Sequence, residues 1–172
     1  EEEAIGRCLE RAGIPIHYRL HGDALGEGGD CLWLDERTLA VGLGYRTNRA
    51  GVAQLQEALG GEVEVIPVEL PYYTGPEACL HLMSLISMVA DDLAVVYPSL
   101  MAVPFYERLK ARGIAMVEVP EAEFLTMGSN VLALAPRRCL MLEGNPVTRR
   151  RLEADTISMA KTIRPSPSTQ VW

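Results

Sequence analysis

Residues 25–48, LGEGGDCLWLDERTLAVGLGYRTN, place two carboxylates and two glycines directly before an apolar stretch. The carboxylates belong to Glu27 and Asp30, and a β-strand needs neither these charges nor the glycines at its start. Further along the chain, His81 lies between two leucines. A carboxylate beside an imidazole can fix the tautomer of the ring and stabilise its charged form, so the pair can transfer protons. We therefore predict that Glu27 and His81 lie within hydrogen-bonding distance of each other, or of one shared small ligand.

Each of these residues also has an ordinary structural interpretation. The two glycines with Asp30 could form a tight turn in which the aspartate side chain bonds to the backbone. His81 could be a half-buried core histidine, and Arg46 could be a solvated residue before a helix cap. These interpretations stay open for each residue taken alone. A shared site is favoured because the residues occupy equivalent places in an internal repeat.

The repeat is about 50 residues long and contains the elements that would position these side chains. Each copy is predicted to contain a hairpin of two short apolar strands, then a helix, then a further strand. The hairpins open at Leu32, Leu85 and Leu132. The helices are predicted at 47–59, 103–113 and 146–154, and strands at 63–70 and 114–120.

Equivalent places of the repeats should converge if the units are arranged around an axis. The segment 27–30 precedes the first hairpin, His81 precedes the second, and the Gly-Ser-Asn segment 128–130 precedes the third. Acid, imidazole and amide groups would then face one another, and the glycines would let a ligand approach the backbone closely. An ordinary α/β sandwich with βαβ crossovers is the alternative, although it would not supply paired hairpins so regularly.

Both ends of the chain depart from the repeat. Residues 1–13 and 14–20 are predicted to be the helix and the strand of a further unit. After Ala154 the composition changes to Ser, Thr and Pro without a clear strand pattern, so residues 155–172 are predicted to form an irregular tail. The repeats therefore amount to about three and a half units in residues 1–154.

Charge and composition exclude several classes of protein. The net charge of −7, without any basic run, argues against nucleic-acid binding. No apolar run reaches the ~18 residues of a membrane span, so we expect a soluble protein. The cysteines Cys8, Cys31, Cys79 and Cys139 are scattered without CxxC or Cys/His spacing, which predicts reduced thiols, a cytoplasmic location and no metal site.

Several motifs in this order resemble the guanidine-modifying superfamily, which includes dimethylarginine dimethylaminohydrolase, arginine deiminase and the amidinotransferases. They are EGGD at 27–30, GYRTN at 44–48, LHLMS at 80–84, NVLALAP at 130–136 and EGNP at 143–146. The resemblance covers roughly residues 1–154. It implies an α/β fold, a portion of a five-bladed α/β propeller built of ββαβ modules, which is called the pentein fold.

The resemblance also implies roles for individual residues. Glu27 would pair with the histidine and with a substrate guanidinium, and His81 would be the general acid and base. Arg46 would hold the substrate carboxylate, with Asp30 as a second substrate-binding residue. The implied reaction is hydrolysis at the guanidinium carbon of arginine or an N-methylated arginine, through a covalent cysteine intermediate and without metal or cofactor. The partner is then a small arginine-like molecule, with a homo-oligomer left open.

Two departures from the family pattern qualify this expectation. Arginine deiminases carry an aspartate two residues after the histidine, where this chain has Met83, so the dimethylarginine hydrolases are the closer match. The family nucleophile is a cysteine in a Gly-rich stretch near the C-terminus, and the Ser/Pro tail contains none. Cys31 and Cys139 begin apolar strands, where an inert thiol is expected. The alternatives are therefore an amidinotransferase or a truncated, non-catalytic homologue, and we expect little or no turnover by this chain alone.

Overall fold

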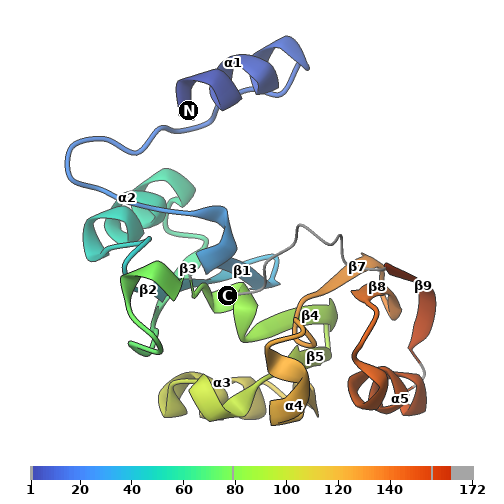
Figure 1. Ribbon diagram of the computed structural model, residues 1–172. Coiled ribbons are helices and arrows are strands. Elements are labelled where there is room, and N and C mark those ends of the chain that lie inside the picture. Colours follow the sequence, from blue (N-terminus) through green and yellow to red (C-terminus); the bar gives the residue numbers. More distant parts are fainter. Residues whose placement is uncertain (1, 79, 156, 164–172) are drawn as a thin grey trace.

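Three small sheets follow one another along the chain in the computed structural model, which describes residues 2–78, 80–155 and 157–163 (Figure 1). Each sheet has three strands: an antiparallel hairpin, and a third strand that joins the second in parallel after a helix. The first unit comprises β1 (Cys31–Asp35), β2 (Thr38–Leu43), α2 (Arg49–Leu59) and β3 (Glu64–Glu69). The second comprises β4 (Ile86–Ala90), β5 (Leu93–Val96), α3 (Val103–Ala111) and β6 (Ala115–Glu118). The third comprises β7 (Val131–Ala135), β8 (Arg138–Leu142), α5 (Pro146–Ala154) and β9 (Ser158–Ile163).

The predicted repeat is confirmed as three separate, similarly folded units. In every unit the middle strand pairs antiparallel with the first strand and parallel with the third. Every hairpin also has the same irregularity near its turn, between Trp33 and Asp35, Met88 and Ala90, or Ala133 and Ala135. The strands do not form one continuous open sheet, so the alternative α/β sandwich is excluded for the described residues.

Neighbouring units share their hydrophobic cores, as in repeat proteins whose units bury their apolar faces against one another. One buried cluster joins Leu32 and Ile66 of the first unit to Ile86 and Phe105 of the second. A second cluster joins the second unit to the third. Strand β5 belongs to both, since Ala94 and Val96 face the first cluster while Leu93 and Val95 face the other. This alternation follows from the two-residue period of a strand, and it fixes how the units sit against each other.

The first strands of neighbouring units meet, with β1 contacting β4 and β4 contacting β7. Helices α2, α3 and α5 lie at the periphery (Figure 1). The short 3₁₀ segments η1 (Gly28–Asp30) and η3 (Leu82–Ser84) precede the first and second hairpins and contact each other. The ends that precede neighbouring hairpins are therefore close together, as the repeat predicts.

Two predictions at the ends of the chain are wrong. Residues 14–20 form no strand, because no described strand lies beside them to pair with; instead the His17 ring lies 3.0 Å from the carbonyl oxygen of Ala58. Part of the predicted tail is strand β9, which pairs in parallel with the exposed edge of β8. Residues 164–172 of that tail lie outside the described residues.

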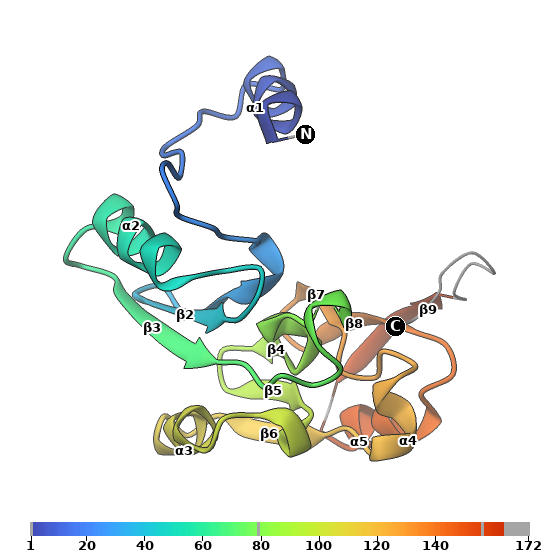
Figure 2. The same cartoon turned by 60° about the vertical axis from the view of Figure 1, so that its left-hand side comes forward.

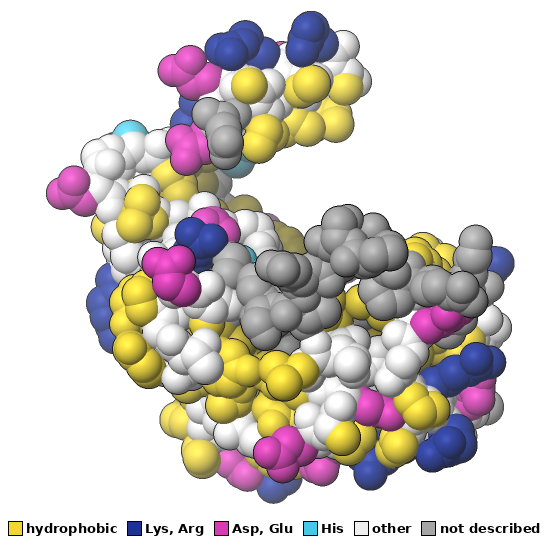
Figure 3. All heavy atoms as spheres, viewed as in Figure 1, with side chains coloured by type: hydrophobic (Ala, Val, Ile, Leu, Met, Phe, Trp, Pro, Cys, Tyr) yellow, Lys and Arg dark blue, Asp and Glu magenta, His cyan; other side chains and the backbone are white. Residues whose placement is uncertain are grey.

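Helix α1 (Glu2–Arg11) lies apart from the three sheets in both views (Figures 1 and 2). Hydrophobic side chains gather along one side of it (Figure 3). Ile5, in this helix, is 61% exposed. Between α3 and the third hairpin lies one further short helix, α4 (Glu121–Phe124). No helix among the described residues has both the length and the apolar character needed to span a bilayer.

Candidate functional site

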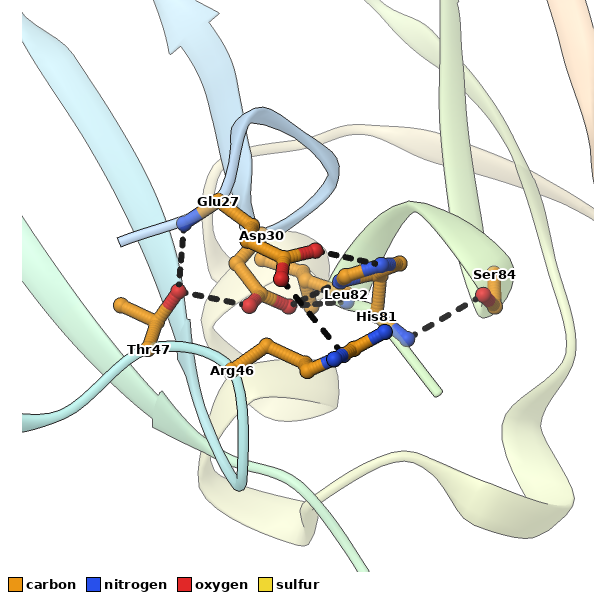
Figure 4. A network of polar contacts seen from close by, with 7 residues as sticks. All are labelled: Glu27, Asp30, Arg46, Thr47, His81, Leu82 and Ser84. Atoms are coloured by element: carbon orange, nitrogen blue, oxygen red, sulfur yellow. Dashed lines mark hydrogen bonds and ion pairs between the residues drawn. The ribbon is translucent and has the colours of Figure 1, made fainter. Parts of the chain in front are cut away.

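Glu27, Asp30, Arg46 and His81 converge between the first and second units (Figure 4). Glu27 directly precedes η1, His81 directly precedes η3, and Arg46 lies in the loop between β2 and α2. The His81 Nε2 atom is 3.3 Å from Oε2 of Glu27, and its Nδ1 atom is 3.3 Å from Oδ1 of Asp30. The predicted proximity of Glu27 and His81 is confirmed, and a second carboxylate faces the other ring nitrogen.

Arg46 completes the group on its solvent side. Its Nε atom lies 3.5 Å from Oε1 of Glu27, so the two oxygens of that carboxylate face a guanidinium and an imidazole. The side chains of Glu27 and Arg46 are 43% and 42% exposed, whereas that of His81 is 17% exposed. Glu27 and Arg46 are therefore open to a small ligand from solvent, and the less exposed histidine ring lies at the base of the group.

Asp30 lies behind the histidine, away from solvent. The residue is 0% exposed, and its carboxylate accepts hydrogen bonds from the Thr47 hydroxyl at 2.7 Å and the Leu82 N–H at 3.0 Å. A buried carboxylate needs such partners to offset its lost hydration. The expected substrate-binding role of Asp30 stays a prediction; in the structure its carboxylate is buried and contacts Thr47, Leu82 and the His81 ring.

The structure gives a different reason for the glycines than close approach of a ligand. A Cβ atom on Gly29 would lie 2.8 Å from Cγ of His81, whereas a Cβ on Gly28 would meet nothing within 4 Å. A Cβ on Gly42, in β2, would lie 2.9 Å from Oδ1 of Asp30. Gly29 and Gly42 therefore leave space for the imidazole and for the carboxylate behind it.

Ser129 links the third unit to the segment that carries His81. Ser129 is 1% exposed, and its hydroxyl donates to the carbonyl oxygen of Ser84 at 2.6 Å. Its own carbonyl accepts from the Ser87 hydroxyl at 2.7 Å. The side chain of Asn130, expected among the converging groups, has no hydrogen bond to them among the described residues. The equivalence of the three repeats therefore extends to position in the fold and not to chemistry.

Two residues of the network were missed in the sequence. The Thr47 hydroxyl bonds to the Glu27 backbone N–H and to the Asp30 carboxylate. The Ser84 hydroxyl accepts from the backbone N–H of His81 at 3.2 Å. The signal for Thr47 was its place in the GYRTN motif, where it was interpreted only as the start of a helix. Ser84 carried no signal beyond its place in LHLMS.

The described cysteines lack the features of an activated nucleophile. Burial, together with the negative charge of Asp30, raises the pKa of the Cys31 thiol, and burial raises the pKa of Cys139. A raised pKa leaves less thiolate at neutral pH, which is the opposite of what a nucleophilic cysteine requires. Cys8 is exposed on α1, and Cys79 lies outside the described residues. The expectation that Cys31 and Cys139 are inert is therefore supported.

The arrangement is suited to binding a planar cation and moving a proton. The doubly protonated imidazole carries an N–H on each nitrogen; Nε2 then faces Glu27, while the Nδ1 contact with Asp30 is an ionic one without hydrogen-bond geometry. Such a ring can release a proton to a group bound at the open face, while Glu27 can accept hydrogen bonds from a guanidinium.

Comparison with known proteins identifies the family. A family model described as arginine deiminase matches residues 12–111, which include Glu27, Arg46 and His81. An arginine deiminase of Rhodococcus erythropolis is 30% identical over 183 residues, covering 87% of this chain and 44% of that protein. An N(G),N(G)-dimethylarginine dimethylaminohydrolase of Streptomyces coelicolor is 30% identical over 152 residues, covering 86% of this chain and 51% of that protein. The chain thus spans about half the length of the curated relatives it matches.

Solved structures share the fold. The dimethylarginine dimethylaminohydrolase of Pseudomonas aeruginosa, a cysteine-to-serine mutant complexed with citrulline, matches with a TM-score of 0.73 at 20% identity, over 97% of this chain and 59% of that one. The N-terminal domain of the cyanobacterial arginine dihydrolase ArgZ, bound to substrate, matches with a TM-score of 0.78 at 21% identity, over 95% and 59%. The chain has the α/β fold of these proteins, and it belongs to the arginine deiminase family, within the superfamily that also contains the dimethylarginine dimethylaminohydrolases and the amidinotransferases.

Proposed function

We propose that this chain carries the acid–base and substrate-binding half of an enzyme that hydrolyses arginine or an N-methylated arginine at the guanidinium carbon. The observation that carries the proposal is the position of the Glu27 carboxylate, which lies 3.3 Å from the His81 ring and 3.5 Å from the Arg46 guanidinium. One small open face thus presents a carboxylate for a cation, an arginine for an anion and an imidazole for proton transfer. An amino acid with a guanidinium side chain has the matching charges.

The proposed mechanism assigns one task to each side chain. Arg46 holds the substrate carboxylate through paired N–H donors, and Glu27 accepts hydrogen bonds from the substrate guanidinium. A thiolate attacks the guanidinium carbon, and the imidazolium of His81 gives its proton to the departing amine, which leaves an amidino-thioether. The neutral ring then takes a proton from water, which attacks the same carbon and releases the thiolate and citrulline. Asp30 positions the ring from its buried side.

The thiolate in this mechanism is not assigned to Cys31 or Cys139, because their pKa values are raised. This observation favours the second candidate function for the isolated chain, a non-catalytic segment that binds substrate without turning it over. Met83, two residues after His81, supplies no carboxylate, and this favours a dimethylarginine hydrolase-like substrate over unsubstituted arginine. The reduced thiols expected in the cytoplasm suit the same chemistry.

We also propose that the three units are part of a five-bladed α/β propeller. The support is the regular ββαβ order, the contact between the first strands of successive units, and the fold similarity to the dimethylarginine dimethylaminohydrolase and ArgZ structures. In such a propeller the open face of the site lies at one end of the axis.

Ligand titration followed by NMR tests the proposed binding function without requiring turnover. L-Arginine and N(G),N(G)-dimethyl-L-arginine should shift the signals of Glu27, Arg46 and His81, whereas agmatine, which lacks the carboxylate, should shift them far less. Arg46→Ala should abolish the preference for L-arginine over agmatine. Arg49→Ala is the matched control, because Arg49 lies three positions away in an exposed ion pair with Glu69. If neither arginine perturbs this group, or if agmatine binds equally well, the proposed substrate class is refuted.

A further inference from the structure

Thr47 is hydrogen-bonded to both acidic residues of the site. Its hydroxyl accepts from the backbone N–H of Glu27 at 3.1 Å and donates to Oδ2 of Asp30 at 2.7 Å. Oδ1 of the same aspartate lies 3.3 Å from Nδ1 of His81, and Nε2 of that ring lies 3.3 Å from Oε2 of Glu27. The contacts therefore form a closed ring of four residues (Figure 4). Thr47 itself is 0% exposed.

The backbone of Thr47 also fixes the loop that carries Arg46. The carbonyl oxygen of Thr47 accepts from the Gly44 N–H at 3.0 Å, which closes the loop 44–47 around Tyr45 and Arg46. A single buried residue thus sets the backbone of Glu27, the orientation of Asp30 and the loop of Arg46. The Thr47 hydroxyl thus donates its one proton to Asp30 and accepts one hydrogen bond from the Glu27 backbone.

The third unit contains a similar buried pair of a threonine hydroxyl and a carboxylate, which has a different role. Thr148 is also 0% exposed, and its hydroxyl donates to Oε2 of Glu123 at 2.7 Å. That carboxylate binds the N-terminus of α5, accepting from the N–H groups of Val147 at 2.7 Å and Thr148 at 2.8 Å. The buried threonine–carboxylate pair of the third unit is therefore a helix cap.

In the first unit the helix has a separate cap. The Asn48 side chain accepts from the Gly51 N–H at 2.8 Å, so Asp30 is not needed at the N-terminus of α2. The Oδ1 atom of Asp30 instead accepts a hydrogen bond from the Leu82 N–H and contacts the His81 ring, both in the neighbouring unit. The Thr47–Asp30 pair of the first unit therefore contacts the histidine of the neighbouring unit, and the N-terminus of α2 is capped by Asn48 instead.

We propose that Thr47 is a positioning residue for His81: its hydroxyl orients Asp30 against the buried ring nitrogen and, through the Glu27 backbone, sets the carboxylate at the other ring nitrogen. The inference rests on the proposed function only for the acid–base role of His81. It predicts that loss of the hydroxyl changes the tautomer and orientation of the ring even where the fold is intact.

Long-range ¹H–¹⁵N correlation spectra of the histidine rings test this directly in the full 172-residue chain. Thr47→Val should abolish the wild-type ring-nitrogen pattern of His81 and move it toward the patterns of the exposed His17 and His21, whereas Thr47→Ser should retain it. Thr148→Val is the matched control, because it removes an equivalent buried bond in another unit and should leave His81 unchanged. A folded Thr47→Val protein with the wild-type His81 pattern overturns the proposal, as does a Thr47→Ser protein that loses it.

A measurement on the unsubstituted chain covers the case in which Thr47→Val does not fold. The Thr47 hydroxyl proton should exchange slowly with solvent and show a cross-peak to the Glu27 amide proton, and rapid exchange like that of a surface hydroxyl overturns the proposal. Titration with L-arginine separates this inference from the proposed function. A chain that fails to bind arginine but shows the Thr47-dependent His81 pattern refutes the function and retains the positioning role.

Discussion

Gly29→Ala should displace His81 although it adds only one methyl group. The added Cβ would lie 2.8 Å from Cγ, 3.0 Å from Cδ2 and 3.2 Å from Cβ of His81. Carbon atoms in contact prefer roughly 3.5–4.0 Å, so the ring must retreat by about 1 Å. The 3.3 Å contacts of its two nitrogens with Glu27 and Asp30 cannot both survive a shift of that size.

The expected effect on stability is that of overpacking, about 1–3 kcal/mol. For a domain of this size, each kcal/mol lowers Tm by roughly 2–4 °C. Thermal unfolding measures this loss, and the ring-nitrogen spectra of His81 measure the displacement. In a complete enzyme, a misplacement of about 1 Å costs on the order of 100-fold in rate.

Gly28→Ala is the control for this substitution. Its Cβ would meet no atom within 4 Å, and its backbone does not have a positive φ. Alanine at such a position reduces the entropy of the unfolded chain, so stability should be unchanged or slightly increased. The steric argument is refuted if Gly29→Ala matches Gly28→Ala in Tm and retains the wild-type His81 pattern.

Three further predictions concern substrate capture, turnover and stability. Arg46→Lys in a complete enzyme should raise KM more than it lowers kcat, because an ammonium cannot form the paired clamp of a guanidinium; an unchanged KM would remove Arg46 from the site. The purified chain should form no citrulline from arginine or methylated arginines at enzymatic rates, on the order of 1 per second, and a colorimetric citrulline assay that detects such a rate would contradict the assignment of Cys31 and Cys139 as inert. Burial of Glu123 opposes its ionisation, but hydrogen bonds from the Thr148 hydroxyl and two backbone N–H groups outweigh it and lower the pKa of the carboxyl below its usual value. Ionised Glu123 therefore stabilises the fold above the pKa of the unfolded state, and this contribution disappears as pH falls through the lower folded pKa. Glu123→Gln should cost about 2 kcal/mol at pH 7 and progressively less as pH falls below about 4, measured by urea unfolding; a pH-independent difference would contradict this account.

Much of the local structure could be predicted from the sequence because it depends on neighbouring residues. Helix α5 begins at Pro146, a residue favoured in the first turn, and α2 begins after the Asn48 cap. The hairpins follow from short apolar runs around polar turns, and the first residues of their first strands lie within one position of Leu32, Leu85 and Leu132. Elements defined by local periodicity and caps are therefore determined by the sequence alone.

The pairing of Glu27 with His81 was also predictable, because it follows from the repeat. Residues at equivalent places in adjacent units meet wherever the units pack side by side. The same reasoning failed for Asn130, since equivalence predicts the position of a residue and not the direction of its side chain. Strand β9 was missed for a different reason: the repeat calls for a strand after the third helix, but this segment has little apolar pattern of its own and forms by pairing with β8.

Only the tertiary structure decided which residues of the site face solvent and which support them. Asp30 is buried because the second unit packs over it. Its Oδ1 atom accepts from the Leu82 N–H and contacts the His81 ring of that unit. Gly29 is required because the imidazole of that same unit lies on its backbone. These contacts join residues that are distant in the chain, and no local pattern encodes them. The sequence by itself determined the repeat and the chemical groups at its ends, and packing between units determined the task of each group.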